Sequence, residues 1–229
     1  MIVSAIIPAA GQGERLGGPV PKQFLHLDGK SILSHTLEIF QKSGLVDSVV
    51  LVVPVNELAQ TRAQWLNNPP LVNKIIAGGK QRQDSVFNGF TEIDADTDIV
   101  LVHDGVRPFI TTEMIEATVT AAIEYGAAIT AIPVSDTIKQ ADDEGFVART
   151  LDREKLRRVQ TPQAFRYSLL ARAFAKAADD SYYGTDEGSL IEYIDEPVKI
   201  IAGSELNIKI TRPEDLILAE KISAHLKAQ

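Results

Sequence analysis

Short runs of apolar, mostly β-branched residues recur along the chain, and they constrain its fold more than any other feature. Strands with one face in solvent alternate apolar and polar residues; these runs do not, so we expect strands covered on both faces. Stretches with helical periodicity lie between most of the runs, which is typical of a mainly parallel α/β sheet. The expected strands are 2–7, 48–53, 74–77, 99–102, 127–133 and 198–201, and the expected helices are 32–41, 84–93, 112–125 and 167–178.

The C-terminal segment is expected to form one more helix, ending at about Lys227. Thr211 is its expected N-cap, because a threonine hydroxyl can accept a hydrogen bond from the first backbone N–H groups of a helix. Glu214 and Asp215 would then lie in the first turn, where carboxylates complement the helix dipole.

The first apolar run leads into a loop rich in glycine and alanine. Small residues let backbone N–H groups approach a ligand closely, and Arg15 and Lys22 add fixed positive charges. This layout is typical of a phosphate-binding loop and indicates chemistry on a polyphosphate, although a glycine-rich turn without a ligand is the alternative. The loop reads Pro8-Ala9-Ala10-Gly11-Gln12-Gly13-Glu14-Arg15-Leu16-Gly17, and Pro21-Lys22-Gln23-Phe24 follows it.

Two better-known phosphate-binding motifs do not fit this loop. The full Walker pattern does not occur in the chain. The dinucleotide fingerprint requires Gly-x-Gly-x-x-Gly, whereas Gly11, Gly13 and Gly17 have one more residue in the second interval. Pro19 and Pro21 also prevent a long helix from starting where the pyrophosphate of NAD would lie.

Charge and composition exclude several classes of protein. The net charge of −8 disfavours a dedicated DNA- or RNA-binding protein, although a local cationic pocket remains compatible with it. With no cysteine, the chain can form neither a disulfide nor a thiolate zinc site, so a required metal would be a hard cation such as Mg²⁺. No signal peptide or membrane span is predicted, and we expect a soluble cytoplasmic protein.

One segment interrupts the alternation of strands and helices. Residues 136–141 and 146–152 flank the polar turn Asp142-Asp143-Glu144-Gly145, which predicts a β-hairpin that leaves the body of the domain. Its strands carry too little apolar surface to be stable alone, so a partner subunit is the expected support and a solvated decoration is the alternative. We therefore expect one domain over 1–229, with 134–160 as a β-hairpin dimerisation arm.

Basic residues follow several of the expected strands. Ligands gather at the carboxyl ends of strands in open α/β sheets, so these side chains would meet at one rim of an otherwise acidic protein. A cationic rim of this kind suits a substrate with several phosphates. The residues are Arg15, Lys22, Arg82, Arg107 and Lys209.

Other polar residues near the strand ends have two interpretations each. Asp104 would bind a ribose hydroxyl or help to hold Mg²⁺, or it simply forms or caps a turn. His103 is interpreted as a packed, hydrogen-bonded histidine rather than a catalytic base. The glycine pair 78–79 forms a plain turn or, with Ser85, reads the edge of a base, and segments 161–163 and 185–187 are interpreted as polar loops or caps. Neither a nucleophile triad nor a zinc-type histidine pair is readable, which leaves chemistry by charge and positioning.

The ordered set of motifs resembles the family of cytidylyltransferases that act on polyol phosphates. The resemblance covers nearly the whole chain and is far more specific than any one motif. The position after Gly79, acidic in some relatives, is Lys80 here. The motifs are Ala9-Ala10-Gly11-x-Gly13-x-Arg15, Pro21-Lys22-Gln23, Arg82-x-x-Ser85-Val86, His103-Asp104-x-x-Arg107-Pro108, Asp136-Thr137-x-Lys139, Thr161-Pro162-Gln163, Thr185-Asp186-Glu187 and Asn207-Ile208-Lys209-x-Thr211-Arg212-Pro213-Glu214-Asp215.

The resemblance implies a Rossmann-like nucleotidyltransferase fold and a reaction of CTP with a polyol phosphate in the presence of Mg²⁺. The acceptor phosphate would attack the α-phosphorus of CTP in line and release pyrophosphate, so no enzyme nucleophile is needed. Methylerythritol phosphate is the favoured acceptor, which would place the protein in the non-mevalonate route to isoprenoid precursors. The resemblance also implies a homodimer in which hairpin arms embrace.

The resemblance assigns roles to individual residues of this chain. Arg15 and Lys22 would stabilise the negative charge that builds up during the reaction, while Arg153 and Lys209 would hold the acceptor. Thr137 and Arg153 would serve the partner's site. The nucleotide would be bound by Ala9, Ala10, Gly11, Gly79, Ser85, Asp104 and Gly105, the acceptor pocket lined by Arg107, Thr137, Thr161 and Thr185, and the metal side contacted by Asp104.

Three alternatives stay open on the sequence alone. A cytidylyltransferase for ribitol 5-phosphate shares most of these motifs and differs in its acceptor pocket. A sugar-1-phosphate nucleotidyltransferase is disfavoured because its loop typically reads Gly-x-Gly-Thr-Arg-Leu. A non-catalytic nucleotide-binding module is disfavoured because it needs no charges dedicated to a transition state, yet Arg15, Lys22, Arg153 and Lys209 occur together.

Overall fold

The computed structural model describes residues 1–11, 20–66 and 70–228. A central sheet of seven strands has the order β11-β7-β10-β6-β1-β4-β5. All neighbouring strands are parallel except β10, which runs antiparallel to β6 and β7. The expected mainly parallel α/β sheet is therefore confirmed. The strands are β1 (Val3–Pro8), β4 (Ser48–Val53), β5 (Val72–Ala77), β6 (Ile99–Val102), β7 (Ala127–Pro133), β10 (Arg157–Arg166) and β11 (Lys199–Ala202).

Helices cover both faces of this sheet, as the continuous apolar runs require. Residues that point alternately to the two faces of β1 belong to two different apolar cores: Ala5 and Ile7 to one, Ile6 to the other. On the first face pack α1 (Ile32–Ser43), α2 (Leu58–Trp65) and α4 (Thr112–Tyr125). On the second face pack α3 (Arg82–Thr91), α5 (Tyr167–Asp179) and α6 (Glu187–Tyr193).

The C-terminal helix α7 (Pro213–Lys227) packs beside a small two-stranded sheet, β2 (His26–Leu27) and β3 (Lys30–Ser31). Thr211 was expected to be its N-cap, and this is wrong. The N-cap is Arg212, and Pro213 takes the first helical position, where the lack of an N–H group costs nothing. Thr211 instead donates its hydroxyl and its backbone N–H to Asp215 Oδ2, each at 2.8 Å.

Strand β10 is the main departure from the sequence expectation, because 161–163 was interpreted as a polar loop. The segment carries buried polar side chains and a proline, so it lacks the apolar run of a central strand. The strand tolerates Pro162 because its register against β7 shifts between Val159 and Gln163. Helices α2 and α6 were also not predicted, because neither has the long apolar periodicity of the other helices.

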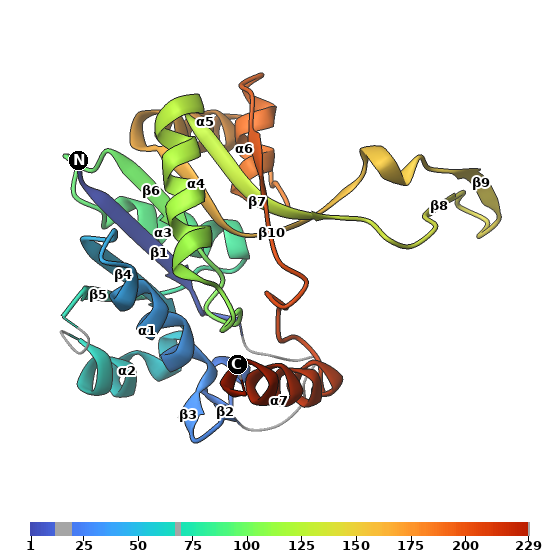
Figure 1. Ribbon diagram of the computed structural model, residues 1–229. Coiled ribbons are helices and arrows are strands. Elements are labelled where there is room, and N and C mark those ends of the chain that lie inside the picture. Colours follow the sequence, from blue (N-terminus) through green and yellow to red (C-terminus); the bar gives the residue numbers. More distant parts are fainter. Residues whose placement is uncertain (12–19, 67–69, 229) are drawn as a thin grey trace.

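The interrupting segment forms the predicted hairpin. Strands β8 (Lys139–Ala141) and β9 (Val147–Thr150) pair antiparallel and project away from the sheet, joined to β7 and β10 by extended chain (Figure 1). A short 3₁₀ helix, Arg153–Lys155, precedes β10. The structure describes all residues from 134 to 156 of this projection, and none of them is buried. Phe146 and Val147 expose 67% and 62% of their surface.

The order of the strands also fixes where a ligand can bind. From β1 the chain builds β4 and β5 on one side and then returns to place β6 on the other side of β1. Loops that follow β1 and β6 therefore diverge above the sheet, at the topological switch point where open α/β sheets bind ligands.

Candidate functional site

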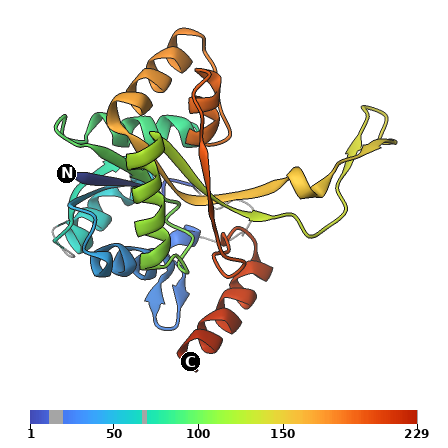
Figure 2. The ribbon, with the colours of Figure 1, turned by 45° about the horizontal axis from the view of Figure 1, so that its top comes forward.

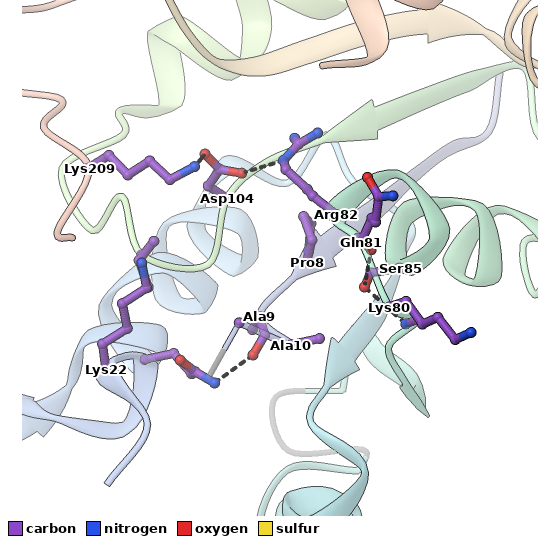
Figure 3. A pocket seen from close by; sticks show the side chains of 14 residues that line it. Pro8, Ala9, Ala10, Lys22, Lys80, Gln81, Arg82, Ser85, Asp104 and Lys209 are labelled. Atoms are coloured by element: carbon purple, nitrogen blue, oxygen red, sulfur yellow. Dashed lines mark hydrogen bonds and ion pairs between the residues drawn. The ribbon is translucent and has the colours of Figure 1, made fainter. Parts of the chain in front are cut away.

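A cavity of about 270 Å³ lies at this switch point, close to the lower end of the size range of small-molecule sites. Its walls come from the ends of β1 and β6, the start of α3 and the segment before α7 (Figure 3). The described lining residues are Pro8, Ala9, Ala10, Gly11, Lys22, Gln23, Gly79, Lys80, Gln81, Arg82, Ser85, Asp104, Val106 and Lys209.

The segment after β1 is held rigidly at one side of the cavity. Ala9 donates its N–H to Val52 O at 2.7 Å, which continues the β1–β4 pairing beyond the strand. The buried Gln23 donates its amide to Ala9 O at 2.6 Å. Because Gln23 belongs to the 3₁₀ helix Lys22–Phe24, this bond also fixes the turn that carries Lys22 to the cavity. Arg15, the other cation expected here, lies outside the described residues.

The loop between β5 and α3 forms the opposite side of the cavity. Gly79 donates its N–H to Ser85 Oγ at 3.0 Å, and Ser85 Oγ donates in turn to Gln81 O at 3.0 Å. A Cβ at Gly78 would overlap the Cβ of Ala10. Gly78 thus lets the two loops approach each other more closely than an alanine would, whereas Gly79 leaves room for Asp84 of its own segment.

The family resemblance implies that these loops bind CTP. Gly78→Ala should then lower the affinity for CTP by about tenfold or more, because displaced loops no longer present their backbone groups in register. Isothermal titration with CTP would measure the change. Adding Ala10→Gly removes the clashing Cβ and should recover part of the affinity. Equal CTP affinity of Gly78→Ala and the wild type would contradict this account of the loop.

Asp104 follows β6 and is the centre of a cluster of charges in the cavity wall. Its Oδ1 lies 3.3 Å from Arg82 Nε, and its Oδ2 lies 2.8 Å from Lys209 Nζ and 3.5 Å from Arg107 Nε. Burial opposes ionisation of this carboxyl, but the three cations outweigh it and hold the pKa of Asp104 well below its usual range. Asp104 therefore remains ionised near neutral pH.

Arg107 lies behind this wall rather than in it. The side chain is nearly buried and donates from Nη1 to Asn207 O at 2.7 Å, which ties the segment before α7 to the loop after β6. Burial lowers the pKa of Arg107, and Asp104 opposes that shift. Gly105, also buried, donates its N–H to Pro8 O at 3.2 Å and holds the loop after β6 against the end of β1.

The buried residues His103 and Thr161 hold Asp104 in place from the interior of the protein. Thr161 Oγ1 accepts the backbone N–H of Asp104 at 3.1 Å and lies 3.0 Å from His103 Nδ1. The buried Thr161 is not among the described residues that line the cavity. Burial lowers the pKa of His103 to about 4, so the ring is neutral near pH 7. This agrees with the interpretation of His103 as a packed, hydrogen-bonded histidine.

The buried histidine makes stability depend on pH. Unfolded histidine binds a proton near pH 6.5, whereas His103 binds it only near pH 4 in the folded protein, so acid favours the unfolded chain between these values. Lowering the pH from about 7 to about 4.5 should remove about 2.5 kcal/mol of unfolding free energy through this group. Urea unfolding at both pH values would measure it. His103→Gln should show a correspondingly smaller loss, and equal losses in both proteins would contradict the assignment.

Three predicted site residues lie away from the cavity in this chain. Thr137 and Arg153 belong to the projecting hairpin segment, where Arg153 Nη1 donates to Ser135 O at 2.7 Å. Thr185 is exposed before α6, and its neighbour Asp186 is the N-cap of that helix. The structure therefore brings together the nucleotide-side candidates with Lys22 and Lys209, but not Thr137, Arg153 or Thr185.

Two buried residues lie behind the charged wall of the cavity. Neither was assigned a role from the sequence. The buried Glu187 accepts from Arg82 Nη1 at 2.8 Å, and Asn207 donates its amide to Thr161 O at 2.9 Å. Burial raises the pKa of Glu187, and Arg82 opposes that shift. Both residues occur inside motifs of the family resemblance, but nothing in their local sequence marks them as buried.

Two features are absent from the part of the chain that the structure describes. Within 1–11, 20–66 and 70–228, no group of three or more histidine, cysteine or acidic residues is placed to hold a metal ion. None of the helices in the same ranges is both long and apolar enough to cross a membrane.

Comparison with known proteins gives a consistent result. A sequence model described as 2-C-methyl-D-erythritol 4-phosphate cytidylyltransferase matches residues 3–225. Proteins of that name from Pelotomaculum thermopropionicum and Syntrophus aciditrophicus are 47% and 44% identical, over 96% and 95% of this chain and 93% and 94% of theirs.

Solved structures agree with the sequence comparison. A 4-diphosphocytidyl-2C-methyl-D-erythritol synthase from Anaerococcus prevotii superimposes with a TM-score of 0.86 at 33% identity, covering 99% of this chain and 98% of that one. A 2-C-methyl-D-erythritol 4-phosphate cytidylyltransferase from Thermus thermophilus gives 0.79 at 32% identity, covering 98% of this chain and all of the other.

Proposed function

The chain belongs to the 2-C-methyl-D-erythritol 4-phosphate cytidylyltransferase family, and we propose how its residues carry out the reaction. It is a nucleotidyltransferase that converts CTP and 2-C-methyl-D-erythritol 4-phosphate into 4-diphosphocytidyl-2-C-methyl-D-erythritol and pyrophosphate. This reaction belongs to the non-mevalonate route to isoprenoid precursors. The residue roles are assigned from the cavity at the switch point, where Lys22, Arg82 and Lys209 face the backbone of two close loops.

The substrates themselves supply the bonding changes. A phosphate oxygen of the acceptor forms a bond to the α-phosphorus of CTP, and the bond from that phosphorus to the bridging oxygen of pyrophosphate breaks. Because the nucleophile is an anion already present, the protein contributes position and positive charge. Lys22 and Arg15 would stabilise the charge on the α-phosphoryl oxygens and on the leaving pyrophosphate.

The nucleotide would lie between the two loops that close the cavity. Ala9, Ala10 and Gly11 would contact it from one side, and Gly79 and Ser85 from the other. Asp104 and Gly105 would lie at its ribose. A carboxylate that stays ionised is a strong hydrogen-bond acceptor for hydroxyl groups. The Lys80 side chain points away from the cavity in Figure 3. A lysine at this position, which is acidic in some relatives, would therefore leave the backbone contacts of the loop with the nucleotide unchanged.

The acceptor would be held next to this nucleotide. Lys209, 2.8 Å from Asp104, would bind the phosphate of methylerythritol phosphate. Arg107 and Thr161 would support this pocket from behind the cavity wall, and Thr185 would contact the acceptor outside the described cavity lining. Thr161 would act mainly by fixing Asp104, since its hydroxyl is engaged there.

Mg²⁺ is the proposed metal, and the donor set fits it. In nucleotide sites Mg²⁺ is held by one or two carboxylates together with substrate phosphates. Asp104 is an ionised carboxylate in the cavity wall, so the ion would be held mainly by the triphosphate with Asp104 on its protein side. When bound, the ion would neutralise part of the triphosphate charge and restrict its geometry.

We also propose that residues 134–160 form the dimerisation arm of a single domain over 1–229. The proposal is supported by the exposure of Phe146 and Val147, and Thr137 and Arg153 are not among the described residues that line this chain's own cavity. In a homodimer these two residues would enter the partner's site. The cytoplasm is the proposed location, because the reaction consumes a nucleoside triphosphate.

Pyrophosphate release tests the function directly. Purified protein would be given CTP and Mg²⁺ with methylerythritol 4-phosphate, with ribitol 5-phosphate or with no acceptor. We expect release with methylerythritol 4-phosphate alone. Release with ribitol 5-phosphate only would keep the mechanism but assign the protein to another pathway. If folded protein that binds CTP releases no pyrophosphate with any acceptor, an enzymatic role is contradicted.

A further inference from the structure

Glu187 is a charged residue with no assigned role, buried directly behind the charged wall of the cavity. It is the first residue of α6, is 1% exposed and is not among the described lining residues. Its Oε1 accepts from Arg82 Nη1 at 2.8 Å, and its Oε2 has no hydrogen-bond partner among the described residues. Burying a carboxylate in this way is costly, so its presence needs a reason other than stability.

Arg82 links this buried carboxylate to the cavity. Its Nη1 binds Glu187 while its Nε lies 3.3 Å from Asp104 Oδ1, so one planar guanidinium bridges two carboxylates. Arg82 lines the cavity, and Figure 3 shows it pointing toward Asp104, with Lys209 reaching the same carboxylate from the opposite side. Asp104 is thereby held on both of its oxygens.

The two elements that carry Glu187 and Arg82 are themselves tied together. Gln83, at the start of α3, donates its amide to Tyr182 O at 3.0 Å and accepts from Gly184 N at 2.8 Å. The buried Gln163 donates to Asp186 Oδ2 at 2.7 Å and accepts from Gly188 N at 3.1 Å. The segment before α6 is thus fixed to α3, and the N-cap and first turn of the helix are fixed to β10. The backbone of Glu187 therefore has little freedom to move if Arg82 moves.

We propose that Glu187 is a positioning residue, which fixes the guanidinium of Arg82 and through it the carboxylate of Asp104 in the cavity wall. The inference rests on the proposed role of Asp104 at the nucleotide. Without the charge of Glu187, Arg82 would turn toward the substrate phosphates, and Asp104 would keep only the cations on its Oδ2 side. A carboxylate displaced by about 1 Å is enough to lower the rate by about a hundredfold.

This role predicts a different outcome from a simple effect on charge. Arg82, Arg107 and Lys209 face the two negative charges of Asp104 and Glu187, so removing one negative charge makes the wall more positive. If charge alone mattered, Glu187→Gln would bind the triphosphate more tightly and keep its rate. Positioning predicts instead that kcat falls by about tenfold to a hundredfold while KM for CTP stays within about threefold or decreases.

The experiment measures kcat and KM for Glu187→Gln with Glu192→Gln, an exposed glutamate of the same helix, as the matched control. Arg82→Lys keeps the charge but cannot bridge two carboxylates, so it should show a similar loss of kcat. If Glu187 acts through Arg82, adding Glu187→Gln to Arg82→Lys should change kcat by less than about twofold. Thermal unfolding identifies variants that are folded at the assay temperature.

Three results would overturn the proposal. They are near-wild-type kcat in folded Glu187→Gln, near-wild-type kcat in Arg82→Lys, and full multiplication of the two effects in the double variant. If Glu187→Gln does not fold, Glu187→Asp, whose shorter side chain keeps the charge but weakens the bond to Arg82, is measured in its place and should show the same loss of kcat. Asp104→Asn, measured in parallel, distinguishes a failure of this inference from a failure of the proposed site. If Asp104→Asn is inactive while Glu187→Gln has normal kcat, only the role of Glu187 is wrong. If Asp104→Asn is fully active, the proposed site itself is wrong.

Discussion

Lys22→Ala is expected to lower kcat by about a hundredfold to a thousandfold while the protein stays folded, because a cation aimed at developing charge contributes about 3–4 kcal/mol to the transition state. Lys22 lies on a short 3₁₀ helix whose next residue, Gln23, is buried and bound to Ala9 O. Because the buried Gln23 anchors the turn, removing the lysine side chain should leave the cavity intact.

Steady-state kinetics at saturating CTP and acceptor, together with thermal unfolding, would measure the effect of Lys22→Ala. Lys30→Ala is the matched control, because Lys30 lies on nearby β3 and forms an exposed ion pair with Glu38. The control should keep wild-type kcat. A folded Lys22→Ala enzyme with nearly normal kcat would remove Lys22 from the proposed mechanism.

Arg153→Ala is expected to lower kcat/KM for methylerythritol phosphate by about tenfold to a hundredfold, because hydrogen bonds to charged groups contribute about 1.5–3 kcal/mol. The affinity for CTP should change little, since Arg153 is not among the described residues that line the chain's own cavity. Lys155→Ala is the matched control: Lys155 belongs to the same 3₁₀ helix and is exposed. An unchanged kcat/KM in Arg153→Ala would contradict its role at the acceptor.

Mixing subunits tests whether the arm serves the partner. In a dimer of one Arg153→Ala subunit and one Lys22→Ala subunit, shared sites would leave one site with both cations and the other with neither. Verified mixed dimers should then recover about half of the wild-type activity, whereas each variant alone stays low. If mixed dimers recover nothing, Arg153 acts in its own subunit or not at all.

The sequence predicted the parallel part of the fold well, because a strand covered on both faces leaves a continuous apolar run. Strands β4, β6 and β7 have the expected bounds, as does α4. Strand β10 has no such run: Gln160, Thr161 and Gln163 are buried in it, and partners distant in sequence, such as Ser204, His103 and Asp186, satisfy their hydrogen bonds. Polar side chains that are satisfied only by tertiary contacts give a pattern that looks like a loop.

The same contrast applies to the site. Lys22, Asp104 and Lys209 follow strands or precede a helix, so the topology of the sheet was enough to predict that they meet. No role was predicted for Glu187, because residues 185–187 were interpreted as a polar loop or cap. Asp186 is the N-cap of α6. That the next carboxylate turns inward toward Arg82, 105 residues away, depends on the hydrogen bonds that tie the segment before α6 to α3 and is not readable in the local sequence.

Strand β10 also sets the mechanical behaviour of the projecting hairpin. The strand is bonded to β6 on one side and to β7 on the other, so pulling it lengthwise would shear two ladders of hydrogen bonds at once. Sideways bending, in contrast, needs only rotation of the unburied chain around 134–138 and 151–156. We therefore expect the tip of the hairpin to move sideways more easily than lengthwise, while the strand that supports Asp104 through Thr161 keeps its register.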